Sequence, residues 1–298
     1  MALTEWLAGG TRGAVALASG RFDIFRRVQG EGPWLTLLHG FPSSSYDYAG
    51  IAPALGDQQR LLLFDFLGFG DSDKPAGHSY SLFEQADVAE ALWREQGITE
   101  TGLVAHDYGA SVATELLARQ AEGKLAVRIT RVLLMNAGLY LDAYRPRPIQ
   151  RLLQWPIVGA LIARCTNEAV FRRSFAAIFA PGKRPSEADL HEHWLAVSRR
   201  DGHHRAASVI RYIAERQRHR PRFEGTLRRS PLPIRFVWGL LDPVSGAAVA
   251  QRIREARPRA DFVALSDVGH YPQLEAPERV AGEILDFFGP NPARRNLV

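Results

Sequence analysis

The sequence predicts an α/β fold in which a mostly parallel sheet, flanked by helices, carries an inserted helical lid. In the first and last parts of the chain, apolar segments suited to buried strands alternate with helical segments. Between residues 139 and 230 the strand patterns stop and helical periodicity remains. We therefore expect a core from residues 1–138 and 231–298, and a helical cap from residues 139–230 over the carboxyl edge of the sheet.

The composition fits one large core with one insertion. The chain has 298 residues, 46% of them hydrophobic, and Cys165 is its one cysteine. A single cysteine excludes an intrachain disulfide and a thiolate metal cluster, and it suits a reducing compartment. The N-terminus lacks a secretory leader pattern, and the most apolar stretch, 152–163, is interrupted by Pro156 and too short to span a bilayer. We expect a cytoplasmic protein with no membrane span.

The charge pattern raises the question of a nucleic-acid partner. The formal net charge is +5, the basic residues are nearly all arginines, and they crowd between Arg199 and Arg229. That run lacks interleaved nucleic-acid-binding motifs, and arginine is preferred to lysine throughout the chain. We expect a solvated helical surface and no nucleic-acid partner. Nothing in the sequence predicts the oligomeric state.

The core elements follow from short apolar runs. Residues 14–19 and 21–28 have the pattern of two strands joined at Gly20. Residues 34–38 are a continuous apolar run, typical of a strand buried on both faces, and residues 61–66 are expected to form the next strand. The other expected strands are 101–105, 129–135, 234–238 and 261–265, and the expected core helices are 80–93, 111–120, 247–256 and 277–288.

Four helices are expected in the cap, over residues 149–165, 169–179, 186–198 and 206–218. Typical helix breakers separate or follow these helices, namely Pro181-Gly182, Asp201-Gly202 and Pro221.

Two loops follow core strands. His39-Gly40-Phe41-Pro42 comes after the strand at 34–38, and we expect the His39 side chain to be structural. Residues 68–75 are rich in glycine and aspartate, which is also compatible with a phosphate-binding loop. Because Lys74-Pro75 does not start a helix, we expect a shaped turn instead.

The chemistry is organised around the turn Ala105-His106-Asp107-Tyr108-Gly109, which lies between a predicted strand and a predicted helix. Its spacing is that of a nucleophile elbow, with Asp107 at the tip in the position where many hydrolases have serine. Serine attacking an alkyl carbon would leave an ether, whereas aspartate leaves an ester that water can hydrolyse. The elbow therefore indicates alkyl rather than acyl substrates.

Two later residues complete a catalytic triad in the order nucleophile, acid, histidine. Asp242 follows the strand at 234–238, and His270 follows the strand at 261–265, so both lie at the carboxyl edge of the sheet. The end of the strand at 129–135 is another place for the acid, but Asn136 stands there and carries no charge. We assign Asp242 as the acid.

The motifs HGFP, DFLGFGDSDKP, VAHDYGAS, GLLDP and GHYPQLEAPERV resemble the epoxide hydrolase and haloalkane dehalogenase branch of the α/β-hydrolase superfamily. More narrowly, HDYG, Arg184-Pro185-Ser186-Glu187, Arg211-Tyr212-Ile213, LLDPV and HYPQLE are similar to the mesoderm-specific transcript proteins, over residues 30–288. The resemblance implies a two-step hydrolysis through an ester on Asp107, with His270 and Asp242 activating water. It also implies an oxyanion hole made by the backbone N–H groups of Phe41 and Tyr108.

The leaving group decides the substrate. Related dehalogenases hold a halide with indole or amide N–H groups, one of them on the residue after the nucleophile, whereas the corresponding positions here are Tyr108 and Phe41. Related epoxide hydrolases use two lid tyrosines. Tyr212 matches one of them, and Tyr140 and Tyr144 are weaker candidates for the other. This favours an epoxide hydrolase, with a haloalkane dehalogenase and a non-catalytic ligand-binding protein as alternatives.

The remaining expectations concern the pocket. We expect apolar cap side chains to line it for a small hydrophobic substrate. Histidines crowd in the cap, but no partners stand at recognisable ligand spacing, so we expect neither a metal nor a cofactor. The expected pocket and cap-packing residues are Trp155, Phe175, Tyr140, Tyr144, Trp194, Phe171 and Phe179, and the two tryptophans are alternative halide donors; the histidines are His191, His193, His203 and His204.

Overall fold

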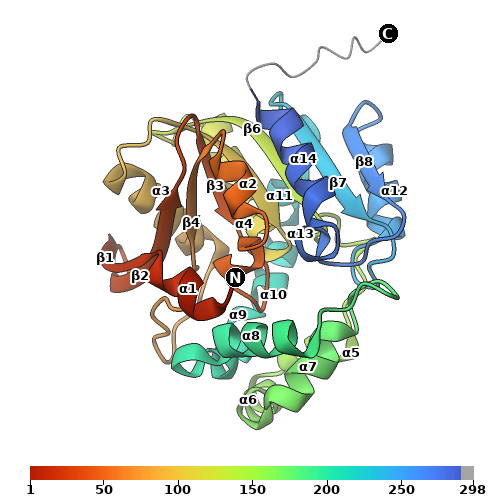
Figure 1. The fold of residues 1–298 in the computed structure, drawn as a ribbon. Helices are drawn as coiled ribbons and strands as arrows, with labels where there is room; N and C mark the ends of the chain where they lie inside the picture. The colour runs from red at the N-terminus through yellow and green to blue at the C-terminus, as the bar shows by residue number, and fades with distance from the viewer. Residues whose placement is uncertain (290–298) are drawn as a thin grey trace.

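A computed structural model describes residues 1–289 of the protein, and residues 290–298 lie outside the described part. Its centre is an eight-stranded sheet in the order β1-β2-β4-β3-β5-β6-β7-β8 (Figure 1). The strands are β1 (Thr11–Leu17), β2 (Gly20–Gln29), β3 (Trp34–Leu38), β4 (Arg60–Phe64), β5 (Glu100–His106), β6 (Arg128–Met135), β7 (Ile234–Gly239) and β8 (Asp261–Leu265).

The predicted mostly parallel sheet is confirmed. β1 and β2 pair antiparallel, β2 pairs antiparallel with β4, and every pair from β4 to β8 is parallel. In the centre, Leu35 of β3 lies opposite Leu61 on one side and Gly102 on the other. The carboxyl ends of the parallel strands therefore meet at one edge, where the polar motifs follow.

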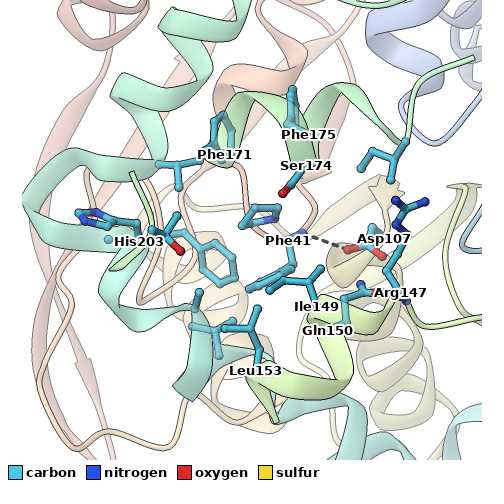
Figure 2. Close-up of a pocket in the computed structure, with 18 of the residues that line it drawn as sticks. Phe41, Asp107, Arg147, Ile149, Gln150, Leu153, Phe171, Ser174, Phe175 and His203 are labelled. Atoms are coloured by element: carbon cyan, nitrogen blue, oxygen red, sulfur yellow. Dashed lines mark hydrogen bonds between the residues drawn. The ribbon is translucent and has the colours of Figure 1, made fainter. Parts of the chain in front are cut away.

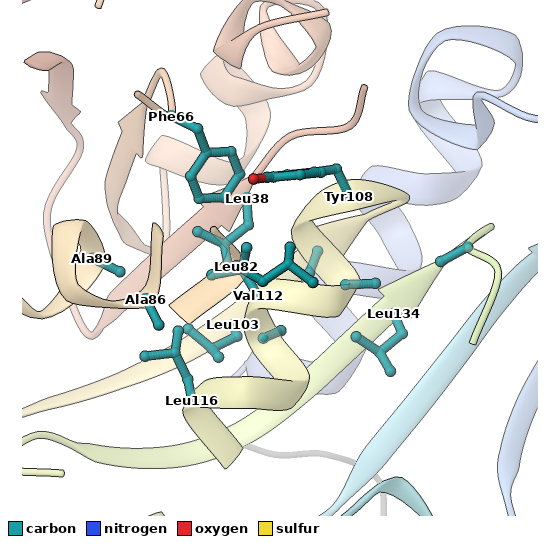
Figure 3. Close-up of a cluster of buried hydrophobic side chains, with 14 of the residues drawn as sticks. Leu38, Phe66, Leu82, Ala86, Ala89, Leu103, Tyr108, Val112, Leu116 and Leu134 are labelled. Carbon is teal, nitrogen blue, oxygen red and sulfur yellow. The ribbon is translucent and has the colours of Figure 1, made fainter. Parts of the chain in front are cut away.

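Helices cover both faces of the sheet, because successive strand side chains point to opposite faces. Leu103 and Leu134 belong to a core cluster with α3 and α4, which Figure 3 shows in part, whereas Val104 and Leu133 belong to a second cluster with α2 and α14. The core helices are α1 (Leu3–Ala8), the 3₁₀ turn η1 (Ser45–Tyr48), α2 (Ala52–Gly56), α3 (Leu82–Glu95), α4 (Tyr108–Ala121), α12 (Ala247–Ala256), α13 (Pro272–Glu275) and α14 (Pro277–Phe288).

The cap forms a helical layer at one end of the molecule (Figure 1). The structure divides the predicted helix at 149–165 in two, because the proline ring at Pro156 excludes a helical conformation for Trp155, whose ψ is 122°. The predicted helix at 206–218 is also divided. The cap elements are α5 (Pro148–Leu153), α6 (Pro156–Cys165), α7 (Glu168–Ala176), α8 (Glu187–Ser198), η2 (Arg199–Arg205), α9 (Ala206–Val209), α10 (Tyr212–Arg218) and α11 (Arg220–Arg229).

The loop at 68–75 is a shaped turn in the structure. The Asp65 carboxylate accepts the N–H groups of Ser45 and Asp71, and the Lys74 ammonium donates to three backbone carbonyls of the turn. His39 lies beside it, fully buried, and its Nε2 accepts the N–H of Phe66 at 3.1 Å. Burial lowers the pKa of His39 to about 4, so the ring is a neutral structural group.

Candidate active site

The turn between β5 and α4 places Asp107 at its tip. Asp107 has a φ of 45° and a ψ of −108°, a strained conformation that turns the chain sharply from the strand into the helix. Gly109 makes the turn possible, because a Cβ there would lie 2.4 Å from the carbonyl oxygen of Leu38. The geometry is that of a nucleophile elbow, and it sets the Asp107 carboxylate at the carboxyl edge of the sheet.

Backbone donors surround this carboxylate. The N–H of Phe41 donates to Asp107 Oδ2 at 3.1 Å, and the N–H of Tyr108 is a second backbone donor to the carboxylate. Burial raises the pKa of Asp107, while the His270 charge and these two N–H groups oppose the rise. The backbone N–H groups of the two residues predicted to form the oxyanion hole thus both donate to the Asp107 carboxylate.

Asp242 and His270 lie next to Asp107, as predicted. His270 Nδ1 is 2.8 Å from Asp242 Oδ2, and His270 Nε2 is 3.9 Å from Asp107 Oδ1. Burial lowers the pKa of His270, but the Asp242 carboxylate outweighs it and Asp107 adds to the rise, so the pKa is raised to about 9. At neutral pH the imidazolium lies between two carboxylates.

Asn136 holds Asp242 in place, a role that the sequence analysis missed. Its side-chain amide donates to Asp242 Oδ2 at 2.9 Å and accepts the N–H of Gly239 at 2.7 Å, which joins the ends of β6 and β7. The Ser245 hydroxyl and the N–H of Val244 also donate to the Asp242 carboxylate. Burial raises the pKa of Asp242, but the His270 charge and these bonds lower it to about 2.

Glu275 organises the loop that carries His270. Its carboxylate accepts the N–H groups of Gly269 at 2.7 Å, Tyr271 at 3.0 Å and, from the cap, Ala180 at 2.8 Å. The His270 N–H in turn donates to the carbonyl oxygen of Ile178, also in the cap. Glu275 lies in the motif HYPQLE, but only the folded chain shows which N–H groups its carboxylate accepts.

An apolar cavity lies between Asp107 and the cap (Figure 2). Asp107 and Arg147 lie at one end of it and His203 at the other. Phe175, a predicted pocket residue, lines the cavity and stacks on Phe171 with ring centroids 5.1 Å apart. Other lining side chains come from every cap helix from α5 to α9, among them Ile149, Gln150, Leu153, Ile162, Val170, Ser174, Val197 and Val209.

Three of the four predicted pocket residues, Trp155, Tyr140 and Tyr144, are not among the residues that line this cavity. Trp155 is 61% exposed and does not line the cavity, because the break before Pro156 turns it toward solvent. Tyr140 is buried under the Arg252 guanidinium, 5.0 Å from the ring centroid, and faces a separate hollow beside α11. Trp194 packs against Phe171 and is not a lining residue either. The structure therefore places Trp155, Tyr140 and Tyr144 outside the lining of this cavity.

Two tyrosines lie close to the elbow. The Tyr212 ring is buried and meets the Tyr108 ring edge-on at 4.9 Å, and the Phe41 ring is 6.4 Å away. The Tyr144 hydroxyl donates to Gln150 Oε1 at 3.2 Å. Burial raises the pKa of both phenols and the Asp107 charge raises it further, whereas the buried Arg216 guanidinium lowers it. Both rings therefore lie within the electrostatic reach of the Asp107 carboxylate.

The cap histidines do not gather around a metal position. His191 pairs with Glu168, and His193 packs between Tyr46 and Phe175. Among residues 1–289, no cluster of three or more His, Cys, Asp or Glu side chains is arranged to hold a metal ion. The helices of this described part also include none with the length and hydropathy needed to cross a bilayer.

Comparison with known proteins agrees with this geometry. The family model described as "alpha/beta hydrolase fold" matches residues 33–277, so the chain belongs to that family of hydrolases. It is 40% identical to the putative hydrolase LipZ of Mycobacterium tuberculosis, over 95% of this chain and 96% of LipZ.

Two further proteins extend the likeness. The human mesoderm-specific transcript homolog protein is 39% identical over 84% of this chain and 77% of its own length, which confirms the similarity seen in the motifs. A haloalkane dehalogenase DbeA-M1 loop variant from Bradyrhizobium elkanii has the same fold, with a TM-score of 0.77 and 22% identity over 93% of this chain and 95% of that one.

Proposed function

We propose that this hydrolase opens epoxides to vicinal diols through a covalent ester on Asp107. The observation that carries the proposal is the position of Asp107, held by two backbone N–H groups and facing a buried His270–Asp242 pair at one end of an apolar cavity. A carboxylate in that position can attack a carbon atom directly, because it needs no base to become a nucleophile. The apolar lining suits a small hydrophobic substrate.

In the first step an Asp107 oxygen forms a bond to an epoxide carbon, and the carbon–oxygen bond of the ring breaks. The alkoxide that leaves takes a proton from a phenol, Tyr212 or Tyr144. His270 then loses its proton and restores the phenol. This transfer is favourable because esterification removes the Asp107 charge, one of the causes that raise the pKa of His270.

In the second step neutral His270 takes a proton from water, and the hydroxide adds to the ester carbonyl. The N–H groups of Phe41 and Tyr108 stabilise the oxyanion. When the intermediate collapses, the bond between the carbonyl carbon and the alkyl oxygen breaks, and the diol takes the proton of the new carboxyl group. Asp107 is again a carboxylate and His270 again an imidazolium, so the protons balance.

The phenols support an epoxide over a halide as the leaving group. Tyr212 and Tyr144 lie within the electrostatic reach of the Asp107 carboxylate, whereas Trp155 is 61% exposed and Trp194 packs against Phe171. Neither the two phenols nor the two tryptophans are among the residues found to line the cavity. A phenol can protonate an alkoxide, and a halide ion needs no proton.

The test is incubation with aliphatic and styrene-oxide-type epoxides, followed by analysis for diols. A single turnover in ¹⁸O-water should put the label in the Asp107 carboxylate and leave the first diol unlabelled. Tyr212→Phe and Tyr144→Phe should each slow epoxide opening by about 100-fold. Halide release from haloalkanes without any diol formation would replace the proposal by a dehalogenase.

A further inference from the structure

The exposed hydrophobic side chains of this protein gather on one part of the cap. Seven of the ten large hydrophobic side chains that are exposed among residues 1–289 lie between residues 149 and 170. Exposed apolar side chains are common singly, but a cluster of this kind marks an interaction surface. The seven are Ile149, Leu152, Trp155, Ile157, Val158, Leu161 and Val170.

Helix α6 shows that the cluster is built into the fold. Its small residues Gly159 and Ala163 are buried, whereas Ile157 is 86% and Leu161 62% exposed. A helix that packs on a core normally has the opposite arrangement, with its large apolar residues inside. In Figure 1, α6 lies on the side of the cap that faces away from the sheet, so this outward face is open to a partner.

Between Asp142 and Glu168 every charged side chain is an arginine. Arg145, Arg147, Arg151 and Arg164 lie within this part of the chain, and no acidic residue stands between Asp142 and Glu168. Both acids are engaged: Asp142 pairs with Arg220 and Arg252, and Glu168 pairs with Arg172 and His191. Within residues 1–289 the four arginines form no ion pair, whereas Arg119 and Arg235 each meet three carboxylates.

We propose that this cap patch, the seven apolar side chains with the four unpaired arginines, docks on the surface of a membrane that contains anionic phospholipids. Apolar side chains then enter the boundary between headgroups and acyl chains, and the arginines meet the phosphate and carboxylate groups. Trp155, the one exposed tryptophan among the described residues, is of the type enriched at that depth.

The charge pattern favours lipid over a second copy of the chain. A two-fold dimer would set the same patch against itself, and the four arginines of each copy would face four others without an acid between them. An anionic surface neutralises them instead. The patch also continues into the cavity, because Ile149 and Val170 are exposed and line it as well.

The test is sedimentation of the full chain with phosphatidylcholine vesicles, with and without an equal part of phosphatidylserine. We expect binding to the anionic vesicles, a blue shift of tryptophan emission that is lost in Trp155→Phe, and release when salt is raised from about 0.1 M to about 1 M. Ile157→Ser with Leu161→Ser should weaken the binding about tenfold or more, and so should Arg151→Glu with Arg164→Glu.

Matched controls separate the patch from general effects of charge or hydropathy. Leu195→Ser removes an exposed leucine from α8, and Arg21→Glu with Arg259→Glu makes the same change in net charge on the core; both should bind like the unaltered protein. The proposal is overturned if the unaltered protein does not sediment with anionic vesicles, or if the patch variants bind as well as the controls. A dimer that Ile157→Ser with Leu161→Ser dissociates, without vesicle binding, would assign the patch to a second copy.

Discussion

The loops at the carboxyl edge of the sheet differ from the cap helices α5 and α6 in how many of their charged groups are paired within the chain. Each carboxylate oxygen of Asp242 and Glu275 accepts at least one hydrogen bond from within the chain. On α5 and α6, Arg151 and Arg164 have no side-chain partner among residues 1–289, and large apolar side chains face outward. The carboxylates of the first region are therefore paired within the chain, whereas the outward side chains of α5 and α6 form the surface that we propose docks on a membrane.

The largest effect should come from the residues of the first region that we propose to be catalytic. His270→Gln should still form the ester, because attack by Asp107 needs no base, but it should stall there and lose about 1000-fold or more in turnover. Mass spectrometry after exposure to a substrate should show an adduct on the peptide that carries Asp107. Asp107→Asn should show none. An inactive His270→Gln protein that stays unmodified, with a substrate that the unaltered protein turns over, would contradict the covalent mechanism.

Truncation of a leucine should also change the free energy of unfolding by different amounts in the two regions. Leu103 in β5 is fully buried, so Leu103→Ala should lower the free energy of unfolding by about 2–5 kcal/mol. Leu161 of α6 is mostly exposed, and Leu161→Ala should change the free energy of unfolding by less than about 0.5 kcal/mol. Urea unfolding of the two variants measures both. Equal losses of unfolding free energy in the two variants would mean that α6 is packed against something in solution. They would contradict the difference between the two regions.

The dependence of stability on pH sharpens the comparison. The pKa of His270 is raised from its unfolded value of about 6.5 to about 9, so its stabilising contribution is complete below pH 6.5 and lost as the pH rises through 9. The shift corresponds to about 3 kcal/mol. Unfolding at several pH values should show this loss in the unaltered protein and not in His270→Gln. The same pH dependence in both proteins would rule out an imidazolium held between the two carboxylates.

A smaller effect is expected at Asn136. Asn136→Ala removes one donor from the Asp242 carboxylate, and we expect kcat to fall about tenfold, equivalent to about 1.4 kcal/mol. The pH profile of kcat should shift with it, because Asp242 sets the pKa of His270. A change in stability alone, with kcat and its pH profile unaltered, would reduce Asn136 to a structural link between β6 and β7.

The parallel sheet, the elbow at Asp107 and the positions of Asp242 and His270 could be predicted because each depends on local pattern. Continuous apolar runs predict buried strands, and parallel strands bring their carboxyl ends together whatever lies between them. The roles of Asn136 and Glu275 could not be predicted, since they depend on contacts between segments far apart in the chain. The exposure of Trp155 could not be predicted either, because periodicity indicated one continuous helix, whereas the break before Pro156 leaves Trp155 between α5 and α6.

The bonds around Glu275 bear on how separable the cap is. Residues 178–180 supply the acceptor for the His270 N–H and one of the three donors to the Glu275 carboxylate. An exchange of caps between related hydrolases, or a chain shortened by residues 139–230, would therefore disturb the loop that carries His270 even with every core residue kept. The two parts are not interchangeable modules, and a transplant that retains residues 178–180 should keep its active-site geometry better than one that does not.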